Sequence, residues 1–171
     1  MNDRAPAPGD LALVQALVNT LDIETGADTL DSAEGRAPFG IDAQDLAAAR
    51  ELREALRAAC LAHAGHPPHR RTRPLTDLLA QAPLLVTVDT ADGSAVLRPA
   101  EPSTLVARVA VAIAGGAADG SWPRLKACEA ADCHWAYYDR SPACRSRWCS
   151  MASCGARAKM RAYRARRGAP D

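Results

Sequence analysis

Two pairs of cysteines with identical spacing constrain the fold of this chain more than any other feature. Four residues separate Cys128 from Cys133 and Cys149 from Cys154, and fifteen residues lie between the pairs. A structural zinc site takes four ligands in a tetrahedron, and cysteine thiolates are common ligands. One such pair alone is a weak signal, but two pairs within 27 residues predict a Cys₄ site that holds one zinc ion per chain. A closed set of this kind leaves no coordination position for water or substrate.

The other two cysteines, Cys60 and Cys144, lie outside this pattern. Because Cys144 precedes Cys149 by the same spacing, it could replace a ligand or act as a nearby redox thiol. We favour a simpler interpretation, in which Cys144 is a spare cysteine in the loop after Pro142. The N-terminus lacks the apolar run of a signal peptide, so we expect a cytoplasmic protein without a membrane partner. In that compartment clustered cysteines usually bind metal rather than form disulfides.

A strongly basic segment follows the last cysteine of the pattern. Residues 157–167 contain six Lys or Arg and no Asp or Glu, and residues 124–171 carry a net charge of +7 against −6 for residues 1–123. Positive side chains one turn apart repel one another unless an anion is present, and the arginine fork suits phosphate. The alternative is a solvated helix whose charges only keep it in solution. The predicted nucleic-acid-binding residues are Arg145, Arg147, Arg157, Lys159, Arg161, Arg164, Arg166 and Arg167.

The sequence also predicts how the last ligand is presented. Ser150 can cap the final helix and so place Cys154 in its first turns. Along that helix Met160 and Tyr163 are expected to pack inward, while three arginines share one face: Arg157, Arg161 and Arg164. A cysteine knuckle, a hairpin and a helix that carries the last ligand together resemble a treble-clef finger. Because such a module is small, zinc should supply most of its folding free energy. We therefore expect zinc removal to unfold residues 124–167 and leave the rest folded.

Residues 9–120 are predicted to form a helix-rich body with one β-hairpin. Asp92-Gly93 between two β-prone runs, 84–89 and 95–98, is a strong hairpin signal. A first helix is expected to follow Asp10 and to end at Leu21, and a loop is expected over residues 25–40. A second helix should run from Asp42 through Cys60, with Arg53, Glu54 and Arg57 on its solvated faces. A short helix over 75–82 and a helix from Pro102 to Gly115-Gly116 complete the expected elements. Histidines 63, 66 and 69 are expected in a solvated loop rather than at a metal.

The fold class is therefore α+β, with a helix-rich body at 9–120 and a treble-clef-like Cys₄ zinc finger with a basic C-terminal helix at 124–167. Residues 126–167 resemble the CGNR zinc finger of a bacterial family in which an N-terminal ABATE domain precedes the finger. The shared pattern is Leu-Lys-x-Cys128-x₄-Cys133-x-Trp-x-Tyr-Tyr-Asp-Arg-Ser141, then Arg-Trp-Cys149-Ser-Met-x-x-Cys154-Gly-x-Arg157-Ala-Lys. The body resembles ABATE domains more loosely, through residues 18–22 and 49–56. The asparagine of the family motif is replaced by Ala156.

The resemblance implies zinc on the four cysteines and a stress-linked, DNA-binding transcription regulator. It also implies that the body senses a small-molecule ligand or forms homodimers. The alternative function is a zinc-stabilised module that binds RNA or an acidic protein. We do not expect an enzyme, because the predicted site is closed and the sequence lacks the zinc-deaminase pattern, a Gly-rich phosphate loop and a nucleophile elbow.

Overall fold

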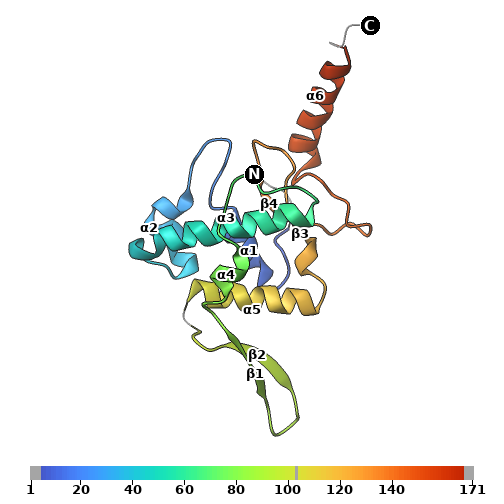
Figure 1. Cartoon of the computed structure of the whole chain (residues 1–171). Helices are drawn as coiled ribbons and strands as arrows, with labels where there is room; N and C mark the ends of the chain where they lie inside the picture. Colours follow the sequence, from blue (N-terminus) through green and yellow to red (C-terminus); the bar gives the residue numbers. More distant parts are fainter. Residues whose placement is uncertain (1–4, 103, 168–171) are drawn as a thin grey trace.

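A computed structural model describes residues 5–102 and 104–167 as a layer of helices with two projections (Figure 1). One projection is the hairpin of β1 and β2, and the other, at the opposite end of the molecule, is helix α6. The elements in chain order are α1 (Leu11–Val18), η1 (Thr29–Asp31), α2 (Ala33–Arg36), η2 (Ala37–Phe39), η3 (Ala43–Asp45), α3 (Leu46–His63), α4 (Leu75–Leu79), β1 (Leu84–Val88), β2 (Ala95–Pro99), α5 (Leu105–Ala118), η4 (Trp122–Arg124), β3 (Leu125–Ala127), β4 (Ala136–Tyr138), η5 (Met151–Gly155) and α6 (Ala156–Arg167).

The main core lies between α1, α3 and α5, where leucine and valine side chains such as Leu17, Leu56 and Val109 are fully buried. The prediction that Gly115-Gly116 ends α5 is wrong, because the helix continues to Ala118. A Cβ at Gly116 would lie 3.0 Å from Leu11 Cδ1, so the glycine lets α5 approach α1 closely. The chain leaves the helical path at Gly120, whose φ of +76° suits glycine.

The segment predicted as a loop over residues 25–40 folds into three short helical turns, η1, α2 and η2. The Asp28 side chain caps η1 and the Ser32 side chain caps α2. Leu30 and Phe39 from this segment enter the main core. The sequence showed the Gly, Asp, Ser and Pro content of a loop, but the same polar residues also act as helix caps.

Most of the remaining predicted elements are confirmed. Asp42 and Asp45 form the capping box of η3, which leads directly into α3. The hairpin has the predicted place, with β1 antiparallel to β2 and Val86 opposite Leu97. α4 ends at Leu79 and is therefore shorter than the predicted 75–82.

Three charged residues of α3 are buried, so their predicted place on solvated faces is wrong. Arg53, Glu54 and Arg57 are 3%, 1% and 0% exposed. Glu54 pairs with Arg53 at 2.8 Å and with Arg57 at 3.2 Å. Arg57 also donates to the backbone oxygens of Val18 at 2.8 Å and His134 at 2.9 Å. The buried charges are thus satisfied by each other and by carbonyls at the ends of other elements.

The β3–β4 hairpin packs into the same core as the helices. Leu125, Ala127 and Ala136 are fully buried members of the main hydrophobic cluster. The side-chain amide of Asn19, at the end of α1, binds both backbone groups of Ala136. The Ala136 N–H donates to Asn19 Oδ1 at 2.7 Å, and Asn19 Nδ2 donates to the Ala136 oxygen at 2.9 Å. The predicted segments 9–120 and 124–167 therefore share one core at this hairpin.

The prediction of a solvated loop for the three histidines is wrong for His63, which is the last residue of α3, whereas His66 and His69 lie in the loop that follows it. His63 Nδ1 lies 2.7 Å from the Leu125 oxygen, and its ring meets Trp122 edge-on. The His69 side chain, 18% exposed, places Nε2 3.3 Å from Glu54. These contacts attach the end of α3 to the buried charges and to β3.

Two further features of the body bear on its predicted partners. An apolar pocket of about 230 Å³ lies between α3 and α5, with Leu52, Leu105 and Val106 in its wall. A small-molecule ligand of the body stays a prediction. Within residues 5–102 and 104–167, no helix combines the length and apolar character needed to cross a membrane.

Candidate metal centre and basic helix

The four predicted ligands converge at one point. The sulfur atoms of Cys128, Cys133, Cys149 and Cys154 all lie within 4.8 Å of one another. The Sγ atoms of Cys133 and Cys149 are 3.7 Å apart, as are those of Cys149 and Cys154. In a tetrahedron with zinc–sulfur bonds of about 2.3 Å, neighbouring sulfurs lie about 3.8 Å apart. The four cysteines are therefore close enough together to hold one zinc ion.

The first two ligands are presented by a tight turn after β3. The Cys133 N–H donates to the Ala130 oxygen at 2.9 Å, and the Cys128 N–H donates to the Trp135 oxygen at 3.0 Å. His134 takes a φ of +46° to close this turn, and its Nδ1 lies 3.0 Å from the Cys128 oxygen. Backbone N–H groups also point at sulfur, from Ala130 toward Cys128 and from Trp135 toward Cys133. Such donors stabilise thiolates.

The proximity of the thiols has a clear electrostatic consequence in the metal-free protein. Hydrogen bonds from Cys133 and Cys149 lower the pKa of Cys128 to about 2. The hydrogen bond to the Cys128 thiolate raises the pKa of Cys149 to about 12, and it also raises the pKa of Cys133. Among these three thiols, ionisation of one therefore opposes ionisation of the other two, because adjacent thiolates repel one another. A divalent cation removes this restriction and is expected to release protons when it binds.

Between β4 and Cys149 a buried carboxylate organises the loop. Asp139 is fully buried and accepts from Lys126 Nζ at 3.0 Å. It also accepts from the hydroxyl groups of Ser141 at 2.7 Å and Ser146 at 2.8 Å. Burial opposes ionisation, but these hydrogen bonds hold the pKa of Asp139 below its usual range. The loop conformation therefore depends on a permanently charged carboxylate, a role that the sequence analysis missed.

The last two ligands lie just before the final helix, Cys149 ahead of the turn η5 and Cys154 within it. The Ser150 hydroxyl accepts from the Ser153 N–H, which confirms Ser150 as the cap. The chain then forms one wide turn, η5, which carries Cys154 and leads into α6. A Cβ at Gly155 would lie 3.1 Å from Met151 Sδ and 3.3 Å from Trp148 Cδ1. The glycine after Cys154 therefore lets this turn pack closely beside the metal site.

Arg157 belongs to the metal centre rather than to the free basic surface. Its Nη2 donates to Cys154 Sγ at 3.3 Å, while its Nη1 donates to Glu24 Oε1 at 3.0 Å. Asp132 lies 3.6 Å from the same Nη1. Zinc with four thiolates carries a net charge of −2, so a guanidinium against one sulfur offsets part of it. The hydrogen bond to Cys154 and the pairing with Glu24 raise the pKa of Arg157 above its ordinary value.

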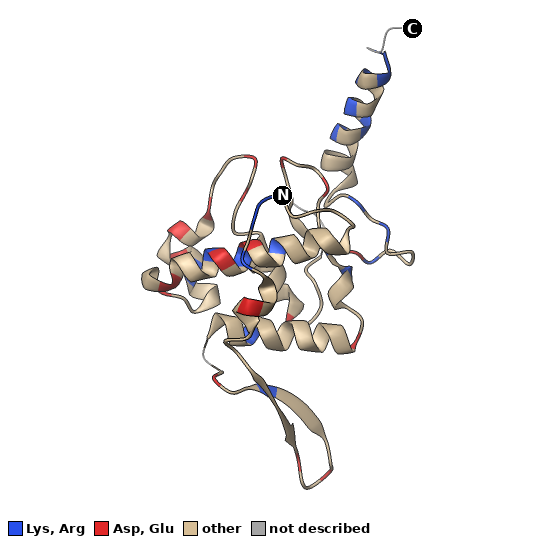
Figure 2. Ribbon diagram, in the orientation of Figure 1, with Lys and Arg blue, Asp and Glu red and all other residues tan. Residues whose placement is uncertain are grey.

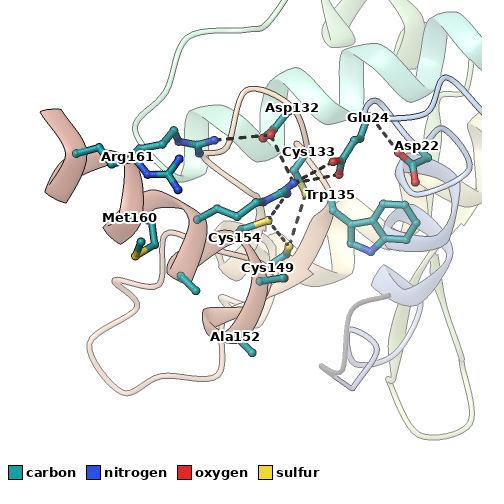
Figure 3. A pocket seen from close by; sticks show the side chains of 14 residues that line it. Asp22, Glu24, Asp132, Cys133, Trp135, Cys149, Ala152, Cys154, Met160 and Arg161 are labelled. Carbon is teal, nitrogen blue, oxygen red and sulfur yellow. Dashed lines mark hydrogen bonds and ion pairs between the residues drawn. The ribbon is translucent and has the colours of Figure 1, made fainter.

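A cleft of about 730 Å³ opens between the start of α6, the cysteine turn and the segment after α1 (Figure 3). Acidic and basic side chains both reach it, and Arg161 lies 3.8 Å from Asp132. Ala156, which replaces the motif asparagine, is exposed and also lines the cleft. The lining residues are Asp22, Glu24, Asp132, Cys133, Trp135, Cys149, Ala152, Ser153, Cys154, Ala156, Arg157, Met160, Arg161 and Arg164.

Beyond its first turn α6 stands clear of the body, and Figure 2 shows Lys and Arg along it without Asp or Glu. No residue of α6 is buried, so the prediction that Met160 and Tyr163 pack inward is wrong; they are 51% and 49% exposed. The inward packing assumed a body surface beside this part of the helix. Arg167 donates to the Tyr163 hydroxyl at 2.7 Å. The other exposed basic residues are Lys159, Arg161, Arg164 and Arg166.

The two predicted arginines outside α6 differ in their surroundings. Arg145 is exposed in the loop before Cys149. Arg147 is also exposed, but its Nε and Nη2 both donate to the carboxylate of Glu129. The residues predicted to bind nucleic acid thus fall into two groups, arginines that already bind a carboxylate and cations that face solvent.

Neither remaining cysteine belongs to the metal cluster. Cys60 is fully buried in the main core, where burial raises its pKa to about 12. Cys144 lies in the loop after Pro142, and its backbone oxygen accepts from Lys126 Nζ. The four clustered ligands do not include it. The arrangement agrees with the interpretation of Cys144 as a spare cysteine.

Comparison with known proteins bears on this same part of the chain. No curated protein matches the sequence. The body, residues 9–120, lies outside the matched segment, so its likeness to ABATE domains stays a prediction. A match to a family model covers the four cysteines, Arg157 and the basic helix: residues 124–167 match the CGNR zinc finger.

Proposed function

We propose that this protein binds DNA as a transcription regulator, with α6 as the element that contacts phosphate. The observation that carries the proposal is the helix itself, which projects from the body with its cations exposed and no acid among them (Figure 2). Mutual repulsion along such a helix is relieved when the phosphates of a nucleic acid neutralise it. The zinc centre fixes the base of the helix, and the body would sense a signal.

The cations differ in what they can contribute. Arg157 is committed to Cys154 and Glu24, so it supports the base of the helix rather than the contact surface. The surface is formed instead by the distal residues Arg164, Arg166 and Arg167, together with Lys159. Among the described residues no ion pair engages these four. Tyr163, half exposed beside Arg167, offers an aromatic face at the same surface.

The salt dependence of binding tests the proposal. Each phosphate contact that is lost lowers the slope of log K against log salt by about 0.9 for duplex DNA. Replacing Arg164, Arg166 and Arg167 by alanine should therefore lower the slope by about 2.7, with zinc content unchanged. The matched control removes the same charge from the body, as Arg70→Ala, Arg71→Ala and Arg73→Ala, and should leave the slope as it is. Absence of measurable affinity for labelled duplex at low salt would refute the proposal.

The alternative function is an interaction with an acidic protein or with RNA. One observation favours a carboxylate partner: Arg157 and Arg161 already lie against Glu24 and Asp132, which shows that α6 accepts carboxylates. If the partner is an acidic protein, the affinity should depend only weakly on salt concentration. If the partner is RNA, the affinity for RNA should exceed that for duplex DNA of equal length. The same titration, extended to these two ligands, separates the three outcomes.

A further inference from the structure

The hairpin of β1 and β2 leaves the body with apolar side chains on both faces. Val86, Val88 and Leu97 are 68%, 56% and 43% exposed on one face, and Leu85 and Val96 are 56% and 47% exposed on the other. Only the first part of the hairpin is covered, where Leu84 packs on a small cluster with α5. A two-stranded hairpin alone is marginally stable in water, and an apolar one of this kind calls for a partner.

The hydrogen-bond register shows which backbone groups of β1 remain available. Outside the strand bounds, the Asp89 N–H donates to the Ser94 oxygen at 2.7 Å and the Ala100 N–H donates to the Pro83 oxygen at 3.0 Å. Bonded and non-bonded pairs alternate along an antiparallel ladder. The bonded residues of β1 are therefore Leu85 and Thr87. Leu84, Val86 and Val88 direct their N–H and C=O groups to the outer edge.

The two edges of the hairpin differ in the protection that they carry. The outer edge of β2 includes Pro99, which has no N–H to offer, and Arg98 adds a charge to that strand. Proline and charge are the usual features that prevent strands from pairing at an edge. The β1 sequence, Leu84–Val88, contains neither. Its edge is therefore open to another strand.

We propose that β1 pairs with β1 of a second copy of this chain, antiparallel about a two-fold axis at Val86. In this register Val86 meets its own copy and Leu84 meets Val88, so all three outward-facing residues of each strand lie in hydrogen-bonded positions. The product is a four-stranded sheet with the order β2-β1-β1-β2. The inference concerns the hairpin and is independent of the proposed contact of α6 with DNA.

Charge distribution favours a second copy over a differently charged partner. The β1 edge is neutral along its length, so two copies meet without repulsion. The acidic residues of the hairpin, Asp89 and Asp92, lie at its tip, while the cation Arg98 lies near its base. An antiparallel pair sends the two acidic tips to opposite ends of the sheet, so their like charges lie far apart.

The size of the contact predicts its strength. Five residues of strand span about 17 Å, and such a contact buries less than the roughly 800 Å² per partner of a standard stable interface. The dimer should therefore dissociate at micromolar concentrations rather than persist at nanomolar ones. Its formation should depend on concentration over the range that ultracentrifugation covers.

Sedimentation of the zinc-loaded full chain at increasing concentration tests the proposal. The expected result is a rise from 18.1 kDa toward twice that mass. Val86→Pro removes an outward N–H without breaking a hydrogen bond within the hairpin, and it should abolish the rise. Leu97→Pro, the matched change on the β2 edge, should leave the rise intact. A wild-type chain that stays monomeric, or a dimer that is lost in Leu97→Pro and kept in Val86→Pro, would overturn the assignment.

A charge pair provides a second test that does not depend on proline. Val86→Lys and Val86→Glu should each be monomeric, because the two-fold axis brings like charges together. An equimolar mixture should dimerise, since lysine then meets glutamate. Both variants change an exposed side chain, and circular dichroism and zinc content report whether they fold. Folded variants that fail to associate in the mixture would contradict pairing at Val86.

Discussion

Removal of the Arg157 side chain should weaken zinc binding although Arg157 is not a ligand. Its Nη2 lies 3.3 Å from Cys154 Sγ, and its Nη1 lies 3.0 Å from Glu24. Loss of a group that hydrogen-bonds a ligand typically lowers metal affinity by 10- to 100-fold, which corresponds to about 1.4–2.8 kcal/mol. The ion pair with Glu24 is largely exposed and should add less than about 1 kcal/mol. We therefore expect a zinc Kd about 10- to 100-fold higher for Arg157→Ala.

Competition with a chromogenic chelator measures this change directly. Arg161→Ala is the matched control, because it removes the same charge from the same face of α6 and the nearest carboxylate is 3.8 Å away. It should bind zinc almost as the wild type does. Arg157→Lys keeps the charge but loses the planar fork, so its affinity should lie between the two. Equal zinc affinities for Arg157→Ala and Arg161→Ala would refute a role for Arg157 at the metal.

Three other predictions follow from the buried groups. Cys128→Ser should lose zinc in a metal analysis whereas Cys144→Ser should retain it, and the reverse result would change the ligand assignment. Arg57→Leu should lower the free energy of unfolding by about 3–5 kcal/mol, because it removes one of the two buried arginines paired with Glu54 and the donor to the Val18 and His134 oxygens. In the same denaturant titration, exposed Arg73→Ala should change it by less than about 0.5 kcal/mol. Burial alone would raise the pKa of Asp28, but the hydrogen bonds from Arg53, Arg50 and the Leu30 N–H, together with the charge of Arg53, outweigh it and lower that pKa. The ionised Asp28 therefore stabilises the fold above the unfolded pKa of 3.8, and this contribution is lost as the pH falls through the lower folded pKa. In an acid titration without zinc, Asp28→Asn should lose less of its free energy of unfolding than the wild type does.

The local chemistry of the finger could be predicted from sequence because its signals lie close together in the chain. Two thiol pairs identify a metal site without knowledge of the fold. Asp-Gly between β-prone runs located the β1–β2 hairpin, and the capping box at Asp42 located the start of η3 and α3. Each of these features depends on residues within a few positions of one another.

Three of the failures concern residues whose partners are distant in sequence. Arg57 looked solvated because nothing near it in the sequence announces the His134 oxygen, 77 positions away. Arg157 looked like a phosphate ligand because Glu24 lies 133 positions earlier. Gly116 looked like a helix stop because its contact with Leu11 is made only in the packed fold. A periodic pattern identifies which face is apolar, but it does not identify which charges the tertiary structure will bury.

The shared core also changes what zinc removal should do. From sequence, residues 124–167 were expected to unfold together without metal. The β3–β4 hairpin, however, is held by apolar burial at Leu125 and Ala136 and by the double hydrogen bond of Ala136 with Asn19. The segment from Ser150 onward is not attached to the body by comparable contacts. Apart from the cysteines, the main contact that its described residues make with the body is the exposed ion pair of Arg157 with Glu24.

Amide exchange with and without a chelator should therefore divide the finger in two. The Ala136 amide, bonded to Asn19 Oδ1 at 2.7 Å, should stay protected after zinc is removed. The Gly155 amide, which donates to the Ser150 oxygen at 3.0 Å in the turn that carries Cys154, should exchange rapidly and recover when zinc is returned. Apolar burial persists without metal, whereas a turn fixed by a thiolate ligand does not. If both amides lost protection equally, the hairpin would depend on zinc as much as α6 does, and the shared core would contribute little to its stability.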